Sequence, residues 1–162
     1  MINLDRINEV ELSDKLISLR RDFHKYPETG WTEYRTTVRI IEELERLGID
    51  IIFGPKIHSE EHMYGKPSVE VDKQCIIRAI EETNRKDLIS IMEGGYTGVV
   101  AIIEGSYPGP TTAFRFDIDS NDLIESDDFN HLPMVADMMG IRLLVLAPQP
   151  FYLSTRINYV VR

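Results

Sequence analysis

The stretch from Thr111 to Asp119 limits what this chain can fold into more than any other part of its sequence. Its apolar and aromatic residues alternate with other residues at a period of two, which predicts a β-strand. Side chains two apart on a strand share a face. One face is therefore apolar and carries Phe114, Phe116 and Ile118. The other face is charged and carries Arg115, Asp117 and Asp119.

The charged face is the candidate functional site of the sequence. In open α/β sheets, ligands and catalytic groups collect beyond the C-terminal ends of the strands. The predicted strand delivers a guanidinium and two carboxylates to that end, so we predict site roles for Arg115, Asp117 and Asp119. A solvated edge strand that ends in ordinary turn acids fits the same pattern.

Composition narrows the class of protein. At 162 residues, with 43% hydrophobic and 28% charged residues, the chain suits one soluble domain or part of a larger one. Its net charge of −9 argues against a nucleic-acid partner, because phosphate contacts need clustered Lys and Arg. No apolar run reaches the roughly 18 residues of a membrane span, and no signal peptide is visible. Cys75 is the one cysteine, so no internal disulfide can form, and we expect a cytoplasmic protein.

The first third of the chain predicts two helices and a strand. Ser13 is the expected cap of the first helix, which Pro27 ends. Thr32 is the expected cap of the second, which carries apolar residues at helical spacing and stops at Gly48. The run from Ile49 to Phe53 then predicts a short buried strand.

Residues 54 to 95 predict an excursion away from the sheet. They contain two expected helices with solvated charged faces, Val71 to Glu82 and Arg85 to Met92. His58 and His62 stand at a four-residue spacing that would suit a metal ion on a helix. Because nearby glycine and proline residues and weak helical periodicity disfavour a helix there, we expect exposed loop histidines.

A second strand is predicted from Thr97 to Glu104. It is apolar on both faces, which is typical of a central position in a sheet. The turn from Gly105 to Pro110 is too short for a helical crossover, so we expect this strand and the 111–119 strand to form an antiparallel hairpin. The predicted fold class is α/β, with two leading helices and then strands interrupted by a helical excursion.

Three motifs, in this order, resemble a known family. They are Arg20-Arg21-Asp22-Phe23-His24 with Pro27, Glu28 and Gly30, then Gly95-Tyr96-Thr97-Gly98-Val99-Val100, then Phe114-Arg115-Phe116-Asp117-Ile118-Asp119. Together they resemble the opening of the dinuclear metal amidohydrolases, the metallopeptidase group of aminoacylase, hippurate hydrolase and indole-acetyl-amino-acid hydrolase. The excursion and residues 116 to 126 are most similar to the p-aminobenzoyl-glutamate hydrolase branch. The resemblance covers about residues 12 to 133 and implies the N-terminal portion of a metallopeptidase catalytic domain.

The resemblance also implies an activity and its cofactors. In this family a pair of divalent metal ions, manganese or zinc, activates a water that attacks the amide carbonyl of an N-acyl or N-aroyl amino acid. Asp117 matches the aspartate that orients a metal ligand, and Arg115 matches the arginine two residues before it. Asp119 and Glu125 match less well-defined acidic positions. His24 matches a family histidine for which a structural hydrogen bond is the expected role.

The metal-binding motif of the family, His-x-Cys-Gly-His-Asp-x-His, is missing from this sequence. Codons that straddle the residue pairs of Val135 to Arg142 nevertheless permit Cys-Gly-His-Asp-Gly-His-Thr in another reading frame. In that frame Met138-Met139 forces the Asp and Met139-Gly140 forces the Gly after it. We therefore predict that residues 1–133 are the N-terminal part of an amidohydrolase catalytic domain and that residues 134–162 are a non-native, out-of-frame tail. Such a chain should bind no metal and be inactive; an unrelated divergent tail is the alternative.

Two other classes of function fit parts of the sequence. One is a non-catalytic α/β interaction module. The other is a magnesium-binding signalling domain that uses Asp117 and Asp119, although it would need a lysine on a later strand and the last lysine is Lys86. We also expect self-association, because the apolar strands at 97–103 and 111–118 lack the downstream partners that cover them in the family.

Overall fold

The computed structural model describes residues 9–121 and 156–161. The chain divides into two compact units, which are taken separately. The first unit comprises residues 1–27 and 121–151, and the second comprises residues 28–120 and 152–162. The candidate site and the whole sheet lie in the second unit.

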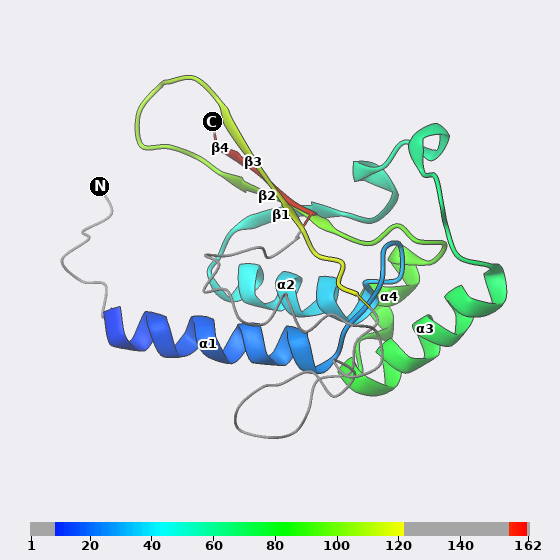
Figure 1. Ribbon diagram of the computed structural model, residues 1–162. Helices are drawn as coiled ribbons and strands as arrows, with labels where there is room; N and C mark the ends of the chain where they lie inside the picture. Colours follow the sequence, from blue (N-terminus) through cyan, green and yellow to red (C-terminus); the bar gives the residue numbers. More distant parts are fainter. Residues whose placement is uncertain (1–8, 122–155, 162) are drawn as a thin grey trace, which may run out of the picture. The chain divides into compact units, whose positions relative to one another are not determined.

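The described part of the first unit is dominated by helix α1, Glu9–Lys25 (Figure 1). The helix ends two residues before Pro27, as predicted, and its last turn carries His24 and Lys25, whose positive charge suits a helix C-terminus. The predicted start at Ser13 is wrong, because α1 begins at Glu9. Residues 9–12 contain no helix breaker, so they extend the helix before the serine can act as a cap.

Helix α2, Tyr34–Arg46, opens the second unit. The predicted cap at Thr32 is wrong: the cap position is held by Glu33, and the Thr32 hydroxyl donates to the Thr29 carbonyl at 2.8 Å instead. The predicted glycine stop is confirmed, since Gly48 has φ +69° and its N–H donates to Glu45 O at 2.9 Å. A second bond, from Ile49 N to Leu44 O at 3.0 Å, completes a Schellman ending.

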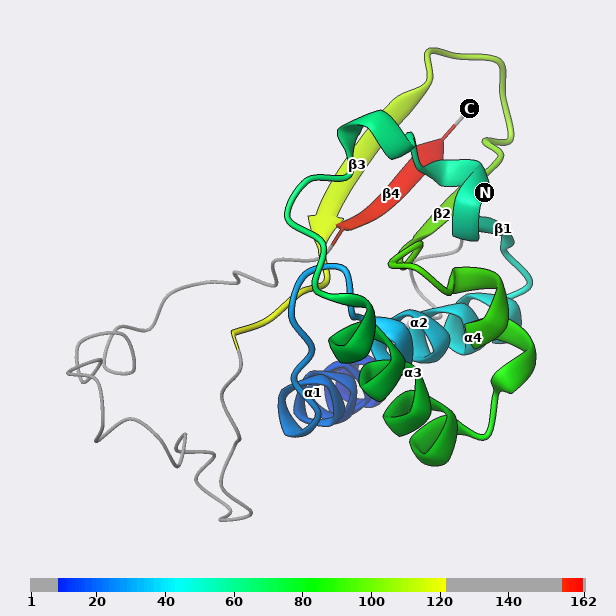
Figure 2. The same cartoon turned by 90° about the vertical axis from the view of Figure 1, so that its right-hand side faces the viewer.

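The sheet contains four strands in the order β1-β2-β4-β3 (Figure 2). Their bounds are Asp50–Phe53 (β1), Val99–Ile103 (β2), Thr112–Asp117 (β3) and Arg156–Val161 (β4). The pairs β1–β2 and β3–β4 are antiparallel, and β2–β4 is parallel. The predicted central position of β2 is confirmed, because it pairs on both sides.

The predicted hairpin between β2 and β3 is wrong, because β4 lies between them. The two strands keep antiparallel directions but stand two strand spacings apart, about 9.5 Å. Residues 104–111 span that distance easily, so the loop length that suggested a hairpin is equally compatible with an inserted strand. The alternating, β-branched sequence of β4 suits the inserted position.

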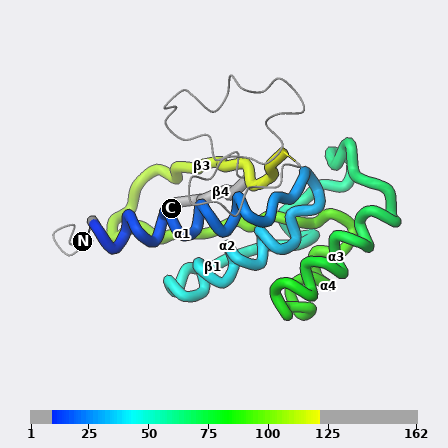
Figure 3. Tube along the Cα trace, turned by 60° about the horizontal axis from the view of Figure 1, so that its bottom comes forward, coloured from blue at the N-terminus to red at the C-terminus, as the bar shows by residue number. Residues whose placement is uncertain are grey.

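The excursion supplies two short 3₁₀ turns and two helices. Their bounds are Gly54–Ile57 (η2), Glu60–His62 (η3), Val69–Thr83 (α3) and Lys86–Met92 (α4). Both helices were predicted, with ends shifted by two residues or fewer. They lie side by side and pack against α2 (Figure 3). No helix in the described ranges is long and apolar enough to cross a membrane.

The core of the second unit forms where α2, the excursion helices and β2 meet. Its buried apolar residues include Val38, Ile41, Leu44, Ala79, Ile89, Met92, Val99 and Ala101. The excursion is therefore part of the core and not only a solvated insertion. This packing fixes the start of α2 against the loop that precedes β2, where the buried carboxylates described below are found.

Candidate functional site

Arg115 and Asp117 lie together on one face of β3, as the period-two pattern predicted. The Arg115 Nη2 and Asp117 Oδ1 atoms are 2.9 Å apart, and the two side chains are 63% and 40% exposed. An ion pair this exposed contributes about 0–1 kcal/mol to stability, because water screens it. Their roles in an active site stay a prediction.

Asp119 does not extend that charged face, because β3 ends at Asp117. The chain after the strand is held by a 2.8 Å hydrogen bond from Ser120 N to Glu28 O, and Ile118 is buried. The Asp119 carboxylate acts on Glu33, whose pKa it helps to raise. The structure thus separates the predicted trio into an exposed ion pair and an aspartate that faces the start of α2. Glu125, the fourth acidic position, lies outside the described residues.

Glu33 is the central buried carboxyl group of this region. It is 6% exposed and accepts a 2.6 Å hydrogen bond from the Thr97 hydroxyl. Burial raises its pKa to about 7; the bond from Thr97 acts against this rise, and the carboxylates of Asp119 and Glu28 add to it. The group can therefore gain or lose a proton near neutral pH. Sequence reasoning gave Glu33 no role, since a glutamate beside a helix start usually lies in solvent.

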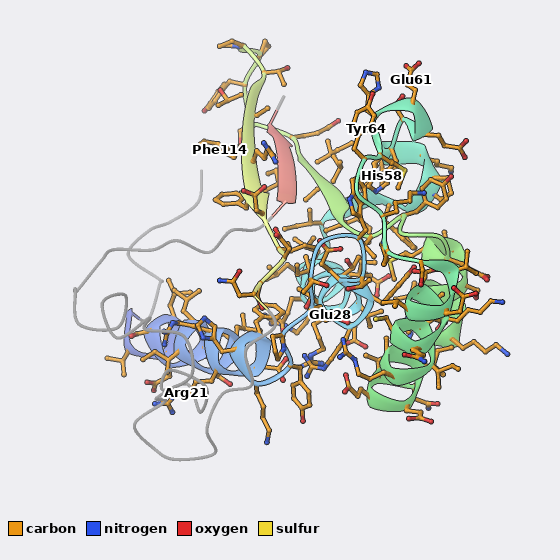
Figure 4. The ribbon with its side chains drawn as sticks, turned by 45° about the vertical axis from the view of Figure 1, so that its right-hand side comes forward. Arg21, Glu28, His58, Glu61, Tyr64 and Phe114 are labelled. Atoms are coloured by element: carbon orange, nitrogen blue, oxygen red, sulfur yellow. The ribbon has the colours of Figure 1, made fainter. Side chains whose placement is uncertain are left out.

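Glu28 is buried as well, but its carboxylate has a structural partner (Figure 4). Its Oε1 accepts from Arg35 N at 3.1 Å and its Oε2 accepts from Thr36 N at 2.7 Å. These are N–H groups in the first turn of α2, which have no partner inside the helix. Burial raises the pKa of Glu28, whereas the two N–H donors and Arg78, at 3.5 Å, lower it. Glu28 therefore caps α2 from outside the helix.

The loop of residues 94–98 is fastened to α2 by side-chain hydrogen bonds. The Tyr34 hydroxyl accepts from Gly95 N at 2.9 Å and donates to Asp72 at 2.5 Å. The Thr37 hydroxyl accepts from Gly98 N at 2.9 Å. With the bond between Thr97 and Glu33, three contacts join this loop to the first turns of α2.

His58 holds the same loop from its other side. Its Nε2 is 2.7 Å from the Thr97 carbonyl oxygen, and its ring centroid lies 6.0 Å from that of Trp31 and 5.8 Å from that of Tyr96. The prediction of an exposed loop histidine is therefore wrong for His58, because two aromatic rings and a carbonyl enclose it. It is correct for His62, whose side chain is 71% exposed.

The described residues do not supply a metal pair. Within residues 9–121 and 156–161 no three His, Cys, Asp or Glu side chains stand close enough to hold a metal ion. Glu28 is committed to the N–H groups of α2 and Glu33 to Thr97, so neither fits the ligand set that the resemblance implied. The residues around 135–142, where the alternative frame permits the metal motif, lie outside the described ranges.

Comparison with known proteins gives the chain its relatives. No protein-family model matches it. It is 39% identical over 122 residues to a p-aminobenzoyl-glutamate hydrolase protein of Escherichia coli, covering 75% of this chain and 28% of that protein. It is 37% identical over 127 residues to indole-3-acetyl-aspartic acid hydrolase of Enterobacter agglomerans, covering 78% of this chain and 29% of that protein.

A solved structure agrees with these matches. The fold resembles the crystal structure of an aminobenzoyl-glutamate utilization protein from Klebsiella pneumoniae, with a TM-score of 0.67 and 29% identity, over 93% of this chain and 36% of that one. The chain spans less than a third of the length of the curated relatives named above. It belongs to the amidohydrolase family of p-aminobenzoyl-glutamate hydrolase and indole-acetyl-aspartic acid hydrolase, and its fold is that of the N-terminal portion of such an enzyme.

Proposed function

We propose that the complete enzyme built on this fold hydrolyses the amide bond of an N-aroyl or N-acyl amino acid. The observation that carries this proposal is the 37–39% identity to two hydrolases named for p-aminobenzoyl-glutamate and indole-3-acetyl-aspartic acid. Both compounds join an aromatic acyl group to an acidic amino acid through an amide. We therefore propose a small amide of that kind, p-aminobenzoyl-glutamate or a close analogue, as the substrate, with the reaction in the cytoplasm.

We further propose that the 162-residue chain is inactive by itself. Amide hydrolysis in a metal enzyme needs a water made nucleophilic by the metal, and the metal needs its ligands. The ligand motif is absent from this reading frame, and Cys75, the one cysteine, lies in the helical excursion. The divalent pair, manganese or zinc, belongs to a version of the protein in which the frame is restored.

Arg115, Asp117 and Asp119 are proposed to serve that complete site by positioning other groups. Asp117 would orient a ligand, with Arg115 at 2.9 Å holding its carboxylate in place. Asp119 would set the charge state of Glu33. The magnesium-binding alternative gains no support from these contacts, since Asp117 already pairs with a cation and Asp119 faces a second carboxyl group.

The experiment compares two purified proteins. One is the 162-residue chain, and the other is expressed from the same gene after its reading frame is restored beyond codon 133. Each is supplied with manganese, zinc or cobalt and assayed for release of p-aminobenzoate from p-aminobenzoyl-glutamate and of aspartate from indole-acetyl-aspartate. We expect turnover from the restored protein alone.

The two parts of the proposal fail separately. Turnover by the 162-residue chain that disappears on chelation would contradict its proposed inactivity and leave the family activity intact. A folded, metal-loaded restored protein that cleaves neither amide would contradict the proposed substrate class. A matched control carries Cys-to-Ser in the restored motif, which should remove both metal content and turnover.

A further inference from the structure

We propose that β3 pairs with the β3 strand of a second copy of this chain, antiparallel and about a two-fold axis at Phe116. The dimer joins the sheets of two copies through their β3 edges. The inference rests on the edge position of β3, on the exposure of its side chains and on a charge pattern that is complementary to itself.

The first observation is that β3 is an edge strand. In the order β1-β2-β4-β3 it stands at one end of the sheet, and within the described residues it pairs with β4 alone (Figure 2). Five of its six residues are exposed, from Thr112 to Phe116. A strand of this kind presents backbone N–H and C=O groups to any second strand that can approach.

The second observation is the exposed aromatic surface on this edge strand. Phe114 is 52% exposed and Phe116 is 40% exposed, and Phe114 projects from β3 in Figure 4. Both rings lie on one strand face because they are two residues apart. Contact with a second copy would remove this apolar area from water, which favours association.

The third observation decides which partner fits. In an antiparallel pair centred on Phe116, each residue faces the one for which the two numbers add to 232, so Arg115 of one copy faces Asp117 of the other, and the reverse. Phe116 faces its own counterpart, and Phe114 lies diagonal to the second copy's Phe116, within reach of its ring. One face of the joined sheet thus carries two ion pairs and the other carries four phenyl rings.

The register also has a natural limit. The Ser120 N–H is already bonded to Glu28 O, so pairing covers residues 114–118 and stops before Ser120. The opposite edge of the sheet lacks an equivalent pattern. Strand β1, Asp50–Phe53, is shorter, carries one acidic residue and no basic one, and therefore cannot form complementary ion pairs with itself. A second copy is thus the partner whose charge matches β3, and its two-fold contact closes at a dimer.

Charge exchange tests the register in solution. We expect the wild-type chain to sediment as a dimer at micromolar concentration. Arg115→Asp and Asp117→Arg each place like charges opposite one another, so each should weaken the dimer by about tenfold or more. The double variant R115D/D117R restores opposite charges and should dimerise like the wild type. Equal amounts of the two single variants should form a mixed dimer, although neither pairs with itself.

Cysteine pairing tests the axis. In a Cys75→Ser background, Phe116→Cys should form an intermolecular disulfide on mild oxidation, because directly opposite residues have Cα atoms about 4.5–5.5 Å apart. Phe114→Cys is the matched control: the two copies of residue 114 are offset by four residues, about 13 Å, and should not react. Circular dichroism checks that every variant keeps the wild-type secondary structure.

The outcomes separate cleanly. A monomeric wild type, single charge variants that dimerise as well as the wild type, or a disulfide at position 114 in place of 116 would each overturn the proposal. Species larger than a dimer would do so too, because they show a contact that does not close. A partner from the remainder of a related hydrolase that replaces the second copy without sensitivity to Arg115 and Asp117 would also contradict it.

Discussion

Thr97 and Glu33 stand 64 residues apart in the chain, and the hydroxyl of the first donates a 2.6 Å hydrogen bond to the buried carboxyl group of the second. Thr97 precedes β2 and Glu33 precedes α2, so this bond ties the entrance of a core strand to the entrance of a core helix. The contact also places an ionisable group with a pKa of about 7 inside the unit that carries the sheet.

The buried Glu33 should make stability depend on pH. The folded pKa of about 7 lies above the ordinary value of 4.5, so between these values the folded state binds more protons than the unfolded state. The contribution is therefore present below pH 4.5 and is lost as pH rises to about 7, and a shift of this size corresponds to roughly 3 kcal/mol. Glu33→Gln, which stays neutral, should flatten the dependence in urea unfolding at pH 5 and pH 7.5. The exposed Glu45→Gln is the control and should leave the slope unchanged.

The cap supplied by Glu28 should be needed for α2. Glu28→Ala leaves the Arg35 and Thr36 N–H groups without their acceptor in a buried place, which should cost about 1–3 kcal/mol of unfolding free energy. Glu28→Gln keeps one acceptor oxygen and should cost less than the alanine variant. Denaturant unfolding measures both changes. Equal losses in the two variants would show that the side chain's volume matters and its hydrogen bonds do not.

Gly95 should tolerate no side chain. Its φ is +84°, and a Cβ there would lie 3.3 Å from the Trp31 carbonyl oxygen. Gly65 is a matched control, because its φ is +76° and an added Cβ would have nothing within 4 Å. Both alanine variants incur the backbone strain, about 1–2 kcal/mol, and Gly95→Ala should lose more because it also crowds Trp31. Thermal unfolding compares them, and equal melting temperatures would remove the crowding argument.

The nucleotide sequence should explain the missing metal motif. Downstream of Pro133 the alternative frame should encode Cys-Gly-His-Asp-Gly-His and continue beyond codon 162 into a Glu-Glu segment. Sequencing the gene across this region is the measurement. Stop codons or unrelated residues in that frame would identify the tail as a genuinely divergent segment.

Local patterns predicted the elements whose causes are local. The alternation around Phe114 and Phe116 located β3 and put Arg115 beside Asp117, because a strand's period sets which side chains share a face. Gly48 ended α2 because a left-handed residue there satisfies the last carbonyl groups.

Long-range contacts were beyond prediction from the sequence. The burial of Glu28 and Glu33 depends on residues that are distant in the chain, Arg78 and Thr97, and no spacing marks them as partners. The same holds for His58, which the structure encloses between two aromatic rings. Strand order failed for a related reason: β4 begins at Arg156, far from the loop that suggested a hairpin.

The place of β4 in the sheet sets the order in which the protein can be completed during synthesis. The parallel ladder joins Val99 to Ile157, and β3 has no described strand beside it until β4 arrives. Parallel pairings between distant segments form slowly, because a long loop must close before any bond is gained. The phenyl rings of β3 therefore leave the ribosome well before their shield does. For that interval the nascent chain displays a hydrophobic strand to chaperones and to neighbouring copies of itself.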